Sequence, residues 1–446
     1  MQPNTLLDAL LDEAGFSHAG LAARVNRAGG AKGLSLRYEH TAVARWLKGQ
    51  RPRGQVPDLI CEVLAERLNR ALTLGDIGLG VSGQGVGETG SPLCSFVERA
   101  TALWRSDEQQ RRHVIEAPAV TGTSAVMPVW EWENPPEDAD VSRAGPMSVS
   151  PADIVTLRAA RTHYELMYRR AGGMATRARI VGFLTTATAP LLRGSYGNEL
   201  GRQLHRATGG LVAVAGICAY DSDAHGLAQR YFHQALRLAK ASGDRGLGAY
   251  VIALLVNQSL LLGEYRQAVA FAEAALRTAG AQITPALASD LYATQAKAYA
   301  RLGDRAGALR CIRRAEREAA RIHPAGEPEE TGYVQPGLIN VQTAEALLSL
   351  GDLSAAHDHA AAAVGAPAHD RGRVHRLAML CQIELCRGEA DRAAQTATEM
   401  AERARGMESR RLRGRLRLVR EQLVASRSAR ADEAAERIDS ALRVPL

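Results

Sequence analysis

Cysteine is scarce in this chain of 446 residues, which contains six, all far apart in the sequence. A chain of this length can bury a core without a disulfide framework, and the spacing does not indicate one. We predict reduced thiols inside a core, as in a cytoplasmic protein. The positions are Cys61, Cys94, Cys218, Cys311, Cys381 and Cys386.

Aromatic residues are also few, at 4%, and the alternation of valine and isoleucine that is typical of strands is almost absent. Alanine, leucine, arginine and glycine recur throughout the chain instead. This composition favours helices that pack through small side chains, and it predicts an all-α fold. The length suggests roughly two to four structural units rather than one core.

Long apolar runs are missing as well. The longest, Leu211 to Tyr220, is about half of what a membrane-spanning helix needs. Acids interrupt the apolar residues of the N-terminal stretch MQPNTLLDALLDEAG and no basic region precedes them, so a signal peptide is not expected. We predict no contact with a membrane and a cytoplasmic location.

Motifs of catalytic and metal sites are also absent from the sequence. H-E-x-x-H, C-x-x-C and G-x-S-x-G do not occur, and His357 and His359 are spaced for different faces of a helix. One G-x-G-x-x-G begins at Gly85, but neither flank predicts the strand and helix that nucleotide binding requires. The stretch around it, 78–92, has the composition of a flexible linker. We expect no enzyme, no catalytic residue, no cofactor and no metal.

Basic residues are concentrated in two places, in a chain with a net charge of +7 and a pI near 9.2. Eight Lys or Arg lie between residues 24 and 53 with one acid, Glu39, and ten arginines lie between residues 403 and 430 with two acids. The first block permits a nucleic acid as partner. The second is either the solvated face of a terminal helix or a surface for nucleic acid or membrane.

The first basic block lies in an N-terminal segment, 1–79, whose apolar residues recur at helical spacing in short pieces. Ser17 is placed to cap a second helix and Thr41 a third, in which Val43 and Trp46 face a core. Turn residues separate roughly four or five such pieces, which predicts a small helical bundle.

Two of these helices have the roles that a helix-turn-helix requires. SHAGLAARVN would lie across the phosphate backbone, and HTAVARWLKGQRPR would enter the major groove. The face opposite the buried residues of this second helix carries His40, Thr41 and Arg45. Arg45 can bind guanine through two hydrogen bonds. The cations that follow lie where phosphates would pass, and they are Lys48, Arg51 and Arg53.

Residues 5–70 resemble the phage-repressor (Cro-type) helix-turn-helix domains. The likeness rests on Leu21-Ala22 in the second helix, on Gly49 after the third, on Arg51-Pro52, and on the following VPDLICEVL. It implies phosphate contacts from the start of the second helix and base contacts from the third. The residues implied are Ser17 and His18 for phosphate, and His40, Thr41 and Arg45 for bases.

The segment between Val25 and Thr41 departs from that resemblance, because it is about ten residues longer than the tight turn of those repressors. The extra length adds Lys32, Arg37 and Tyr38 as candidates for contacts to the DNA backbone. The predicted DNA-binding set is Ser17, His18, Arg37, His40, Thr41, Arg45, Lys48, Arg51 and Arg53.

A repeat organises the C-terminal part of the chain. Gly263 is followed at +5, +9 and +12 by alanines, and nearly the same pattern follows Gly303, Gly351 and Gly388, with Asp223 in the glycine position one unit earlier. A small or medium residue lies seven positions before each of these starts. Glycine can make the turn of a helical hairpin, and small residues let its two helices approach closely. The pattern is similar to tetratricopeptide-like repeats.

The predicted organisation is therefore a helix-turn-helix domain, 1–79, a linker and irregular connecting region, 80–150, and a tetratricopeptide-like α-solenoid, 151–446, with a C-terminal capping helix. Stacked hairpins leave a concave surface, where we expect a peptide, small-molecule or protein effector. The units lie near 209–242, 249–282, 289–322, 337–370 and 374–407.

Across nearly its full length the chain resembles actinobacterial regulators that combine these two parts, the Nsd-type negative regulators of sporulation and antibiotic production. TAVARWLKGQRPRGQVPDLI, APLLRGSY, the stretch 219–251 and LLGEYRQAVAFAEAAL carry this likeness. It implies transcriptional control of differentiation or secondary metabolism, by a repressor. We expect a homodimer on double-stranded DNA whose repeat domain changes the spacing of the DNA-binding heads. The alternative is a repeat scaffold that acts through protein partners without specific DNA binding.

Overall fold

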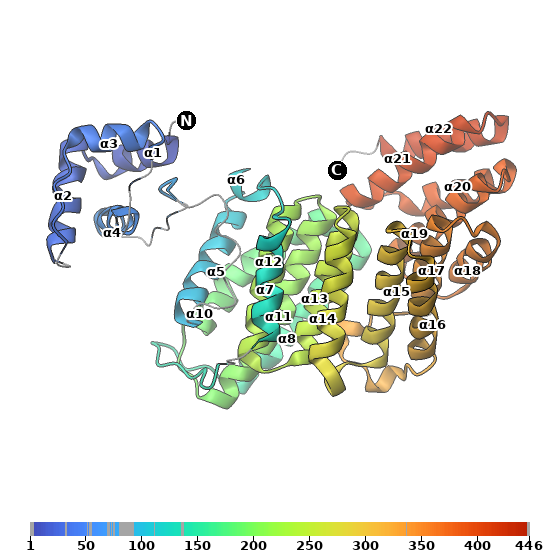
Figure 1. Cartoon of the computed structure of the whole chain (residues 1–446), viewed down its shortest axis with the longest axis horizontal. Helices are drawn as coiled ribbons and strands as arrows, with labels where there is room; N and C mark the ends of the chain where they lie inside the picture. Colours follow the sequence, from blue (N-terminus) through green and yellow to red (C-terminus); the bar gives the residue numbers. More distant parts are fainter. Residues whose placement is uncertain are drawn as a thin grey trace. The chain divides into compact units, whose positions relative to one another are not determined.

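The computed structural model divides the chain into two compact units, Met1–Gly85 (unit 1) and Val86–Leu446 (unit 2) (Figure 1). Each unit is described by itself. The described residues form helices and no β-strand, which confirms the predicted all-α fold. The structure describes residues 4–31, 34–50, 52, 56–68, 72, 74, 76–79, 93–110, 112–134, 138–335 and 337–443.

The described residues of unit 1 form a bundle of four helices, of which the first two begin at side-chain caps. Asn4 accepts a hydrogen bond from the backbone N–H of Leu7 at the start of the first helix, and Ser17 accepts one from Gly20 at the start of the second, as predicted. The third helix begins one residue before Thr41, so the prediction that Thr41 is its cap was wrong. The helices are α1 (Thr5–Ala14), α2 (His18–Ala31), α3 (His40–Leu47) and α4 (Val56–Leu68).

The segment 93–134 belongs to the predicted irregular connecting region but is helical. The apolar spacing around Phe96 and Trp104 already predicts a helix in its first part, and the error concerns the rest. The segment contains α5 (Leu93–Glu108), α6 (Arg112–Ile115) and α7 (Thr123–Glu133), which are part of unit 2. Trp104 is fully buried, and its indole N–H donates to Gln234 at 3.0 Å. Trp132 also packs into unit 2, whereas Trp130 is 53% exposed. The prediction was wrong here because the apolar residues of α7 lie among prolines and acids.

One long helix and three shorter elements lead from this segment into the repeats. Ser150 and Asp153 form a reciprocal capping box at the start of the longest of them. The elements are α8 (Pro151–Ala171), α9 (Gly173–Phe183), the π-helix η1 (Leu184–Thr188) and α10 (Ala189–Leu192).

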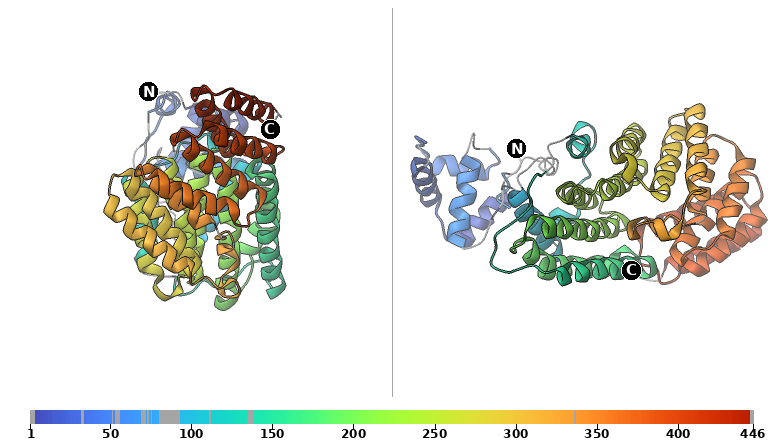
Figure 2. Two further views of the ribbon diagram at one scale, coloured as in Figure 1. Left: turned by 90° about the vertical axis from the view of Figure 1, so that its right-hand side faces the viewer. Right: turned by 90° about the horizontal axis from the view of Figure 1, so that it is seen from below.

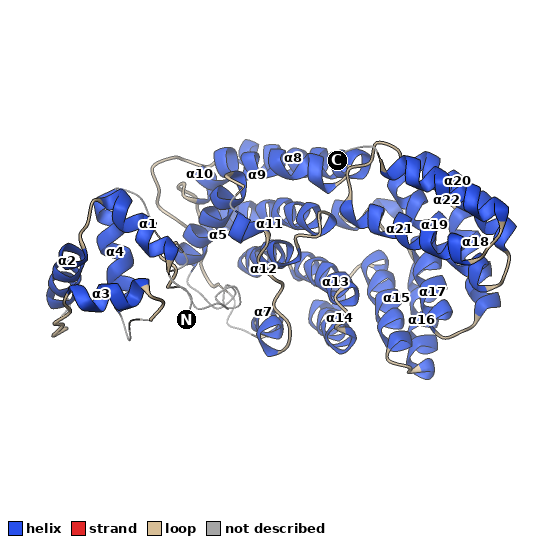
Figure 3. Ribbon diagram, turned by 90° about the horizontal axis from the view of Figure 1, so that it is seen from above, coloured by secondary structure: helices blue, strands red, loops and turns tan. Residues whose placement is uncertain are grey.

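The repeats are antiparallel helix pairs that follow one another in a curved row (Figure 2 and Figure 3). Short 3₁₀ turns η2 (Gly280–Gln282), η3 (Pro324–Gly326) and η4 (Glu329–Thr331) lie in the connections. The pairs are α11 (Asn198–Asp221) with α12 (His225–Ser242), α13 (Arg245–Leu261) with α14 (Tyr265–Ala279), α15 (Pro285–Arg301) with α16 (Arg305–Ala319), α17 (Leu338–Ser349) with α18 (Leu353–Gly365), α19 (Asp370–Cys386) with α20 (Ala390–Ala404), and α21 (Arg410–Ala425) with α22 (Ala429–Leu442).

The turns of these pairs confirm the proposed repeat. Gly263, Gly303, Gly351 and Gly388 all have φ between 78° and 79°, in the left-handed region that glycine adopts easily. Asp223 has φ 59° in the same place. The predicted single capping helix was wrong, because the C-terminal segment is a sixth pair.

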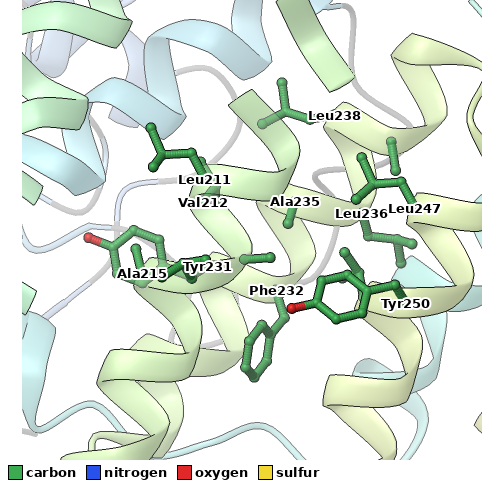
Figure 4. Close-up of a cluster of buried hydrophobic side chains, with 14 of the residues drawn as sticks. Leu211, Val212, Ala215, Tyr231, Phe232, Ala235, Leu236, Leu238, Leu247 and Tyr250 are labelled. Carbon is green, nitrogen blue, oxygen red and sulfur yellow. The ribbon is translucent and has the colours of Figure 1, made fainter. Parts of the chain in front are cut away.

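Small residues bring the paired helices together, as the spacing predicted. A Cβ atom on Gly216 would lie 2.6 Å from Cε1 of Phe232, so glycine is required where α11 crosses α12. The alanines at +5, +9 and +12 from Gly263 are fully buried. Figure 4 shows the core around this first pair, where Phe232 and Tyr231 come from α12 and Tyr250 from α13.

All six cysteines are free thiols, but the prediction that they lie in the core was wrong for Cys94 and Cys386, which are exposed. Cys386 is the last residue of α19. Among the described residues, no helix is long and apolar enough to cross a membrane.

Candidate nucleic-acid interface

Helix α3 is held in unit 1 by two residues on one face. Val43 is fully buried, and Trp46 is 4% exposed. The ring of Tyr38, just before the helix, meets the ring of Trp46 edge-on, with their centroids 5.2 Å apart. Trp46 is therefore a core anchor. The buried side chains of α3 and the contact from Tyr38 in the preceding loop together fix the orientation of the helix.

The loop before α3 is shorter than the sequence suggested. Helix α2 continues to Ala31 instead of ending near Val25. The side-chain amide of Asn26 then binds both backbone groups of Tyr38, donating to its carbonyl at 2.8 Å and accepting from its N–H at 2.9 Å. Leu36 packs so closely on Gly29 that a Cβ atom there would lie 2.4 Å from its Cδ1. The loop end is thus pinned to α2, and Tyr38 is a packing residue.

The opposite face of α3 brings three of the predicted residues together. His40, Thr41 and Arg45 are all exposed, and Lys48 is exposed directly after the helix. Since Thr41 does not cap the helix, its hydroxyl is available on this face. No ion pair joins Arg45 or Lys48 to a carboxylate in the part of the chain that the structure describes. Such a face can donate hydrogen bonds to base edges and phosphates.

The start of α2 supplies a second group of predicted contacts. Ser17 and His18 are exposed there, although the Ser17 oxygen already accepts the capping hydrogen bond from Gly20. Free N–H groups and the helix dipole favour an anion such as phosphate at a helix start. Arg37 is exposed in the loop between α2 and α3. Arg51 and Arg53 lie outside the described residues, as does Lys32.

Unit 1 is the part of the chain that comparison with known proteins recognises. Residues 7–80 match the SP15 N-terminal domain. The match begins in α1 and ends directly after Leu79, which is buried in the core of unit 1. It therefore corresponds to the folded bundle that presents α3 and does not extend into the repeats. No curated protein matches the chain.

Unit 2 contains a cavity that the sequence did not locate. Its volume is about 280 Å³, and the first helix of every repeat pair contributes to its wall, with α8 opposite. Aromatic, charged and apolar side chains all line it. In the described part of the chain no group of three His, Cys, Asp or Glu side chains is placed to hold a metal ion. The cavity is thus a candidate binding site without the residues of a metal centre.

The C-terminal arginine block has two environments. Arg420 forms an ion pair with Asp439 of α22 at 3.0 Å, which joins the two helices of the last pair. Arg411 and Arg415, on another face of α21, line the cavity. The apolar stripe of α21 is buried as predicted, but the arginines around it do not form one solvated face. Helical spacing placed them correctly on α21 but could not show that this face turns inward.

Proposed function

We propose that the protein is a sequence-specific DNA-binding transcriptional regulator, in which unit 1 binds double-stranded DNA. The observation that carries this proposal is the exposed face of α3, with His40, Thr41 and Arg45 opposite the buried Val43 and Trp46. A recognition helix needs this division between a core face and a groove face.

The residues of this surface have distinct roles in the proposal. Arg45 binds a guanine edge, and His40 and Thr41 contact neighbouring bases. Lys48 and Arg37 neutralise phosphates, which fixes the register of α3 on the duplex without reading the sequence. Ser17 and His18 hold a phosphate at the start of α2. Arg51 and Arg53 extend the phosphate contacts beyond Lys48.

The biological role in this proposal follows from the resemblances. The likeness of unit 1 to Cro-type domains supports DNA binding, and the likeness of the chain to Nsd-type regulators supports repression of differentiation or secondary metabolism in the cytoplasm. The repeats would form the homodimer and bind an effector. An effector that changed the distance between two unit 1 domains would change which half-site spacing the dimer fits.

Selection of bound duplexes from a random library tests the proposal, with the intact protein at moderate salt and with or without cell extract. A single enriched motif that shifts in a mobility assay is the expected result, and two motif copies at fixed spacing would indicate a dimer. Recovery of no motif under either condition would overturn the proposal. The repeat-scaffold alternative then requires that a chain lacking residues 1–80 still captures the partners of the full chain.

A further inference from the structure

Helix α8 lies across the concave side of the repeats and partly encloses the cavity of unit 2. Helix α8 packs against α11 and also reaches α19, near the other end of the row (Figure 3). At its end, the carbonyl of Ala171 accepts a hydrogen bond from the N–H of Glu408 at 2.8 Å, just before α21. Helix α8 thereby covers part of the concave surface that an open solenoid would offer to a large partner. The space that remains beside it has the size of a small-molecule site.

A buried carboxylate fixes this closure. Asp221, at the end of α11, accepts hydrogen bonds from the N–H of Gly173 in α9 and from the hydroxyl of Ser409 at the start of α21, both at 2.8 Å. It also pairs with Arg371 of α19. One fully buried side chain therefore joins α9, α11, α19 and the start of α21 beside the cavity.

At one end of the cavity, basic side chains outnumber acidic ones. Arg371 uses one amino group to bind Asp221, but its Nη1 has no hydrogen-bond partner among the described residues, although Arg371 is only 4% exposed. Arg411 lies over the ring of Tyr220, 4.5 Å from its centroid. Neither Arg411 nor Arg415 forms an ion pair with a carboxylate among the described residues. The nearby Glu345 is already bound to Lys297 at 2.8 Å.

Burial and the neighbouring arginines together lower the pKa of two histidines in the wall. Burial, together with Arg371, Arg415 and Arg411, holds the pKa of His375 well below its usual range. Burial, with Arg169 and Arg371 nearby, lowers the pKa of His369 to about 4. Both imidazoles therefore stay neutral near pH 7 and add nothing to the positive charge of the arginines.

Another part of the wall is apolar. Val214, Ile217, Leu254, Val341 and Met379 face the cavity between α11, α13, α17 and α19. Their side chains give a ligand an apolar surface to bury.

Beyond this apolar wall, Gln342 donates to buried Asp290 at 2.7 Å, while its own oxygen, also buried, has no partner. Asp290 and Lys297 are seven residues apart on α15, which separates the two polar ends by about 10 Å along the helix axis.

We propose that this cavity binds a small organic anion, with a carboxylate or phosphate head group at Arg371, Arg411 and Arg415 and an apolar body along α13 and α17. A hydrogen-bond donor at the other end of the ligand would satisfy the oxygen of Gln342. The volume, about 280 Å³, is close to the lower end of the roughly 300–1,000 Å³ that is typical of small-molecule sites. This ligand would be the effector of the proposed regulator, and only that identification rests on the proposed function.

Calorimetric titration of the full chain, without DNA, tests the proposal with four probes of one chain length. Octanoate and octyl phosphate are the anionic probes, and octanol and octylamine are their neutral and cationic counterparts. We expect at least one anionic probe to bind tenfold or more tightly than octanol, and the better of the two identifies the head group. Equal affinities for octanol and both anions, or no binding by any probe, would overturn the proposal.

Variants locate the binding. Arg411→Gln with Arg415→Gln should weaken the anionic probe tenfold or more, while Arg417→Gln, on an exposed position of the same helix, should leave it unchanged. Val341→Phe keeps every charge but fills the cavity, so it should weaken binding of the same probe. It provides the test if the double variant does not fold. Unchanged affinity in a folded Arg411/Arg415 variant, or in Val341→Phe, contradicts the assignment. Because no DNA is present, failure of DNA recognition leaves these results unaffected.

Discussion

Asp221 and Arg371 form an ion pair between helices that are 150 residues apart in the sequence, and their side chains are 0% and 5% exposed. Removal of one partner leaves the other charge buried without compensation. The pair therefore holds the two ends of the repeat row around the cavity more firmly than a surface pair of the same geometry would.

Asp221→Asn should lower the free energy of unfolding of unit 2 by about 3–5 kcal/mol, because it removes the charge that Arg371 requires and keeps the side-chain shape. Urea denaturation followed by circular dichroism measures this. Asp358→Asn, whose side chain is 79% exposed, is the matched control. A loss no larger than that of the control would show that the closure does not depend on the pair.

Arg45→Ala should relax the preference for one base pair by about 1–3 kcal/mol, because a bidentate contact to a guanine edge is lost. Lys48→Ala should instead weaken all duplexes about equally and reduce the salt dependence of binding. Competition assays with single-base variants of a selected site measure both effects. Arg158→Ala, an exposed arginine of α8, controls for the change in net charge. An unchanged base preference in Arg45→Ala would mean that α3 is not the recognition helix.

Asn26→Ala should destabilise unit 1 by about 1–3 kcal/mol, because it removes two hydrogen bonds to the backbone of Tyr38. It should also weaken DNA binding, since the loop that holds Tyr38 against Trp46 is released. Thermal denaturation and mobility shift on the same samples test the two effects. Ser35→Ala, exposed in the same loop, should change neither. Full DNA affinity in a destabilised Asn26→Ala protein would show that the hydrogen bonds from Asn26 to Tyr38 are not needed for DNA recognition.

Arg427→Gly should stabilise unit 2 by up to about 1 kcal/mol, since it relieves a left-handed backbone that costs a non-glycine residue about 1–2 kcal/mol. Arg427 has φ 56° at the turn of the sixth pair. The opposite change, Gly303→Ala, should destabilise by a similar amount. A Cβ atom at Gly303 meets no atom within 4 Å, so its cost reports the backbone alone. Shifts of the same sign in the two variants would contradict this explanation.

Unit 2 should become less stable as the pH falls from about 6.5 to about 4, in part because of His205. Burial lowers the pKa of this fully buried histidine to about 4. The unfolded chain binds its proton below about pH 6.5, whereas the folded chain does not, and the difference amounts to about 2 kcal/mol at pH 5. His205→Gln should lose about that much of the dependence between pH 7 and pH 5 in denaturant titrations. His163→Gln, at an exposed position, should retain it.

The sequence by itself determined the helix pairs and the inner face of α3. Both are local properties, because the spacing of small residues around Gly263 or Gly303 acts within one hairpin, and Val43 and Trp46 lie within one helix. Positions of this kind obey helical periodicity whatever surrounds them. The sixth pair was missed because Arg427, rather than glycine, occupies its turn.

Only the tertiary structure decided which helix faces meet residues that are far away in the sequence. The pairing of Asp221 with Arg371, the position of α8 across the repeats, and the direction of Arg411 and Arg415 depend on the curvature that accumulates over all the pairs. No local pattern encodes that curvature, since it is the sum of small rotations between successive packed helices. An arginine-rich stripe therefore looked like a solvated face in the sequence, and the fold made part of it the wall of a cavity.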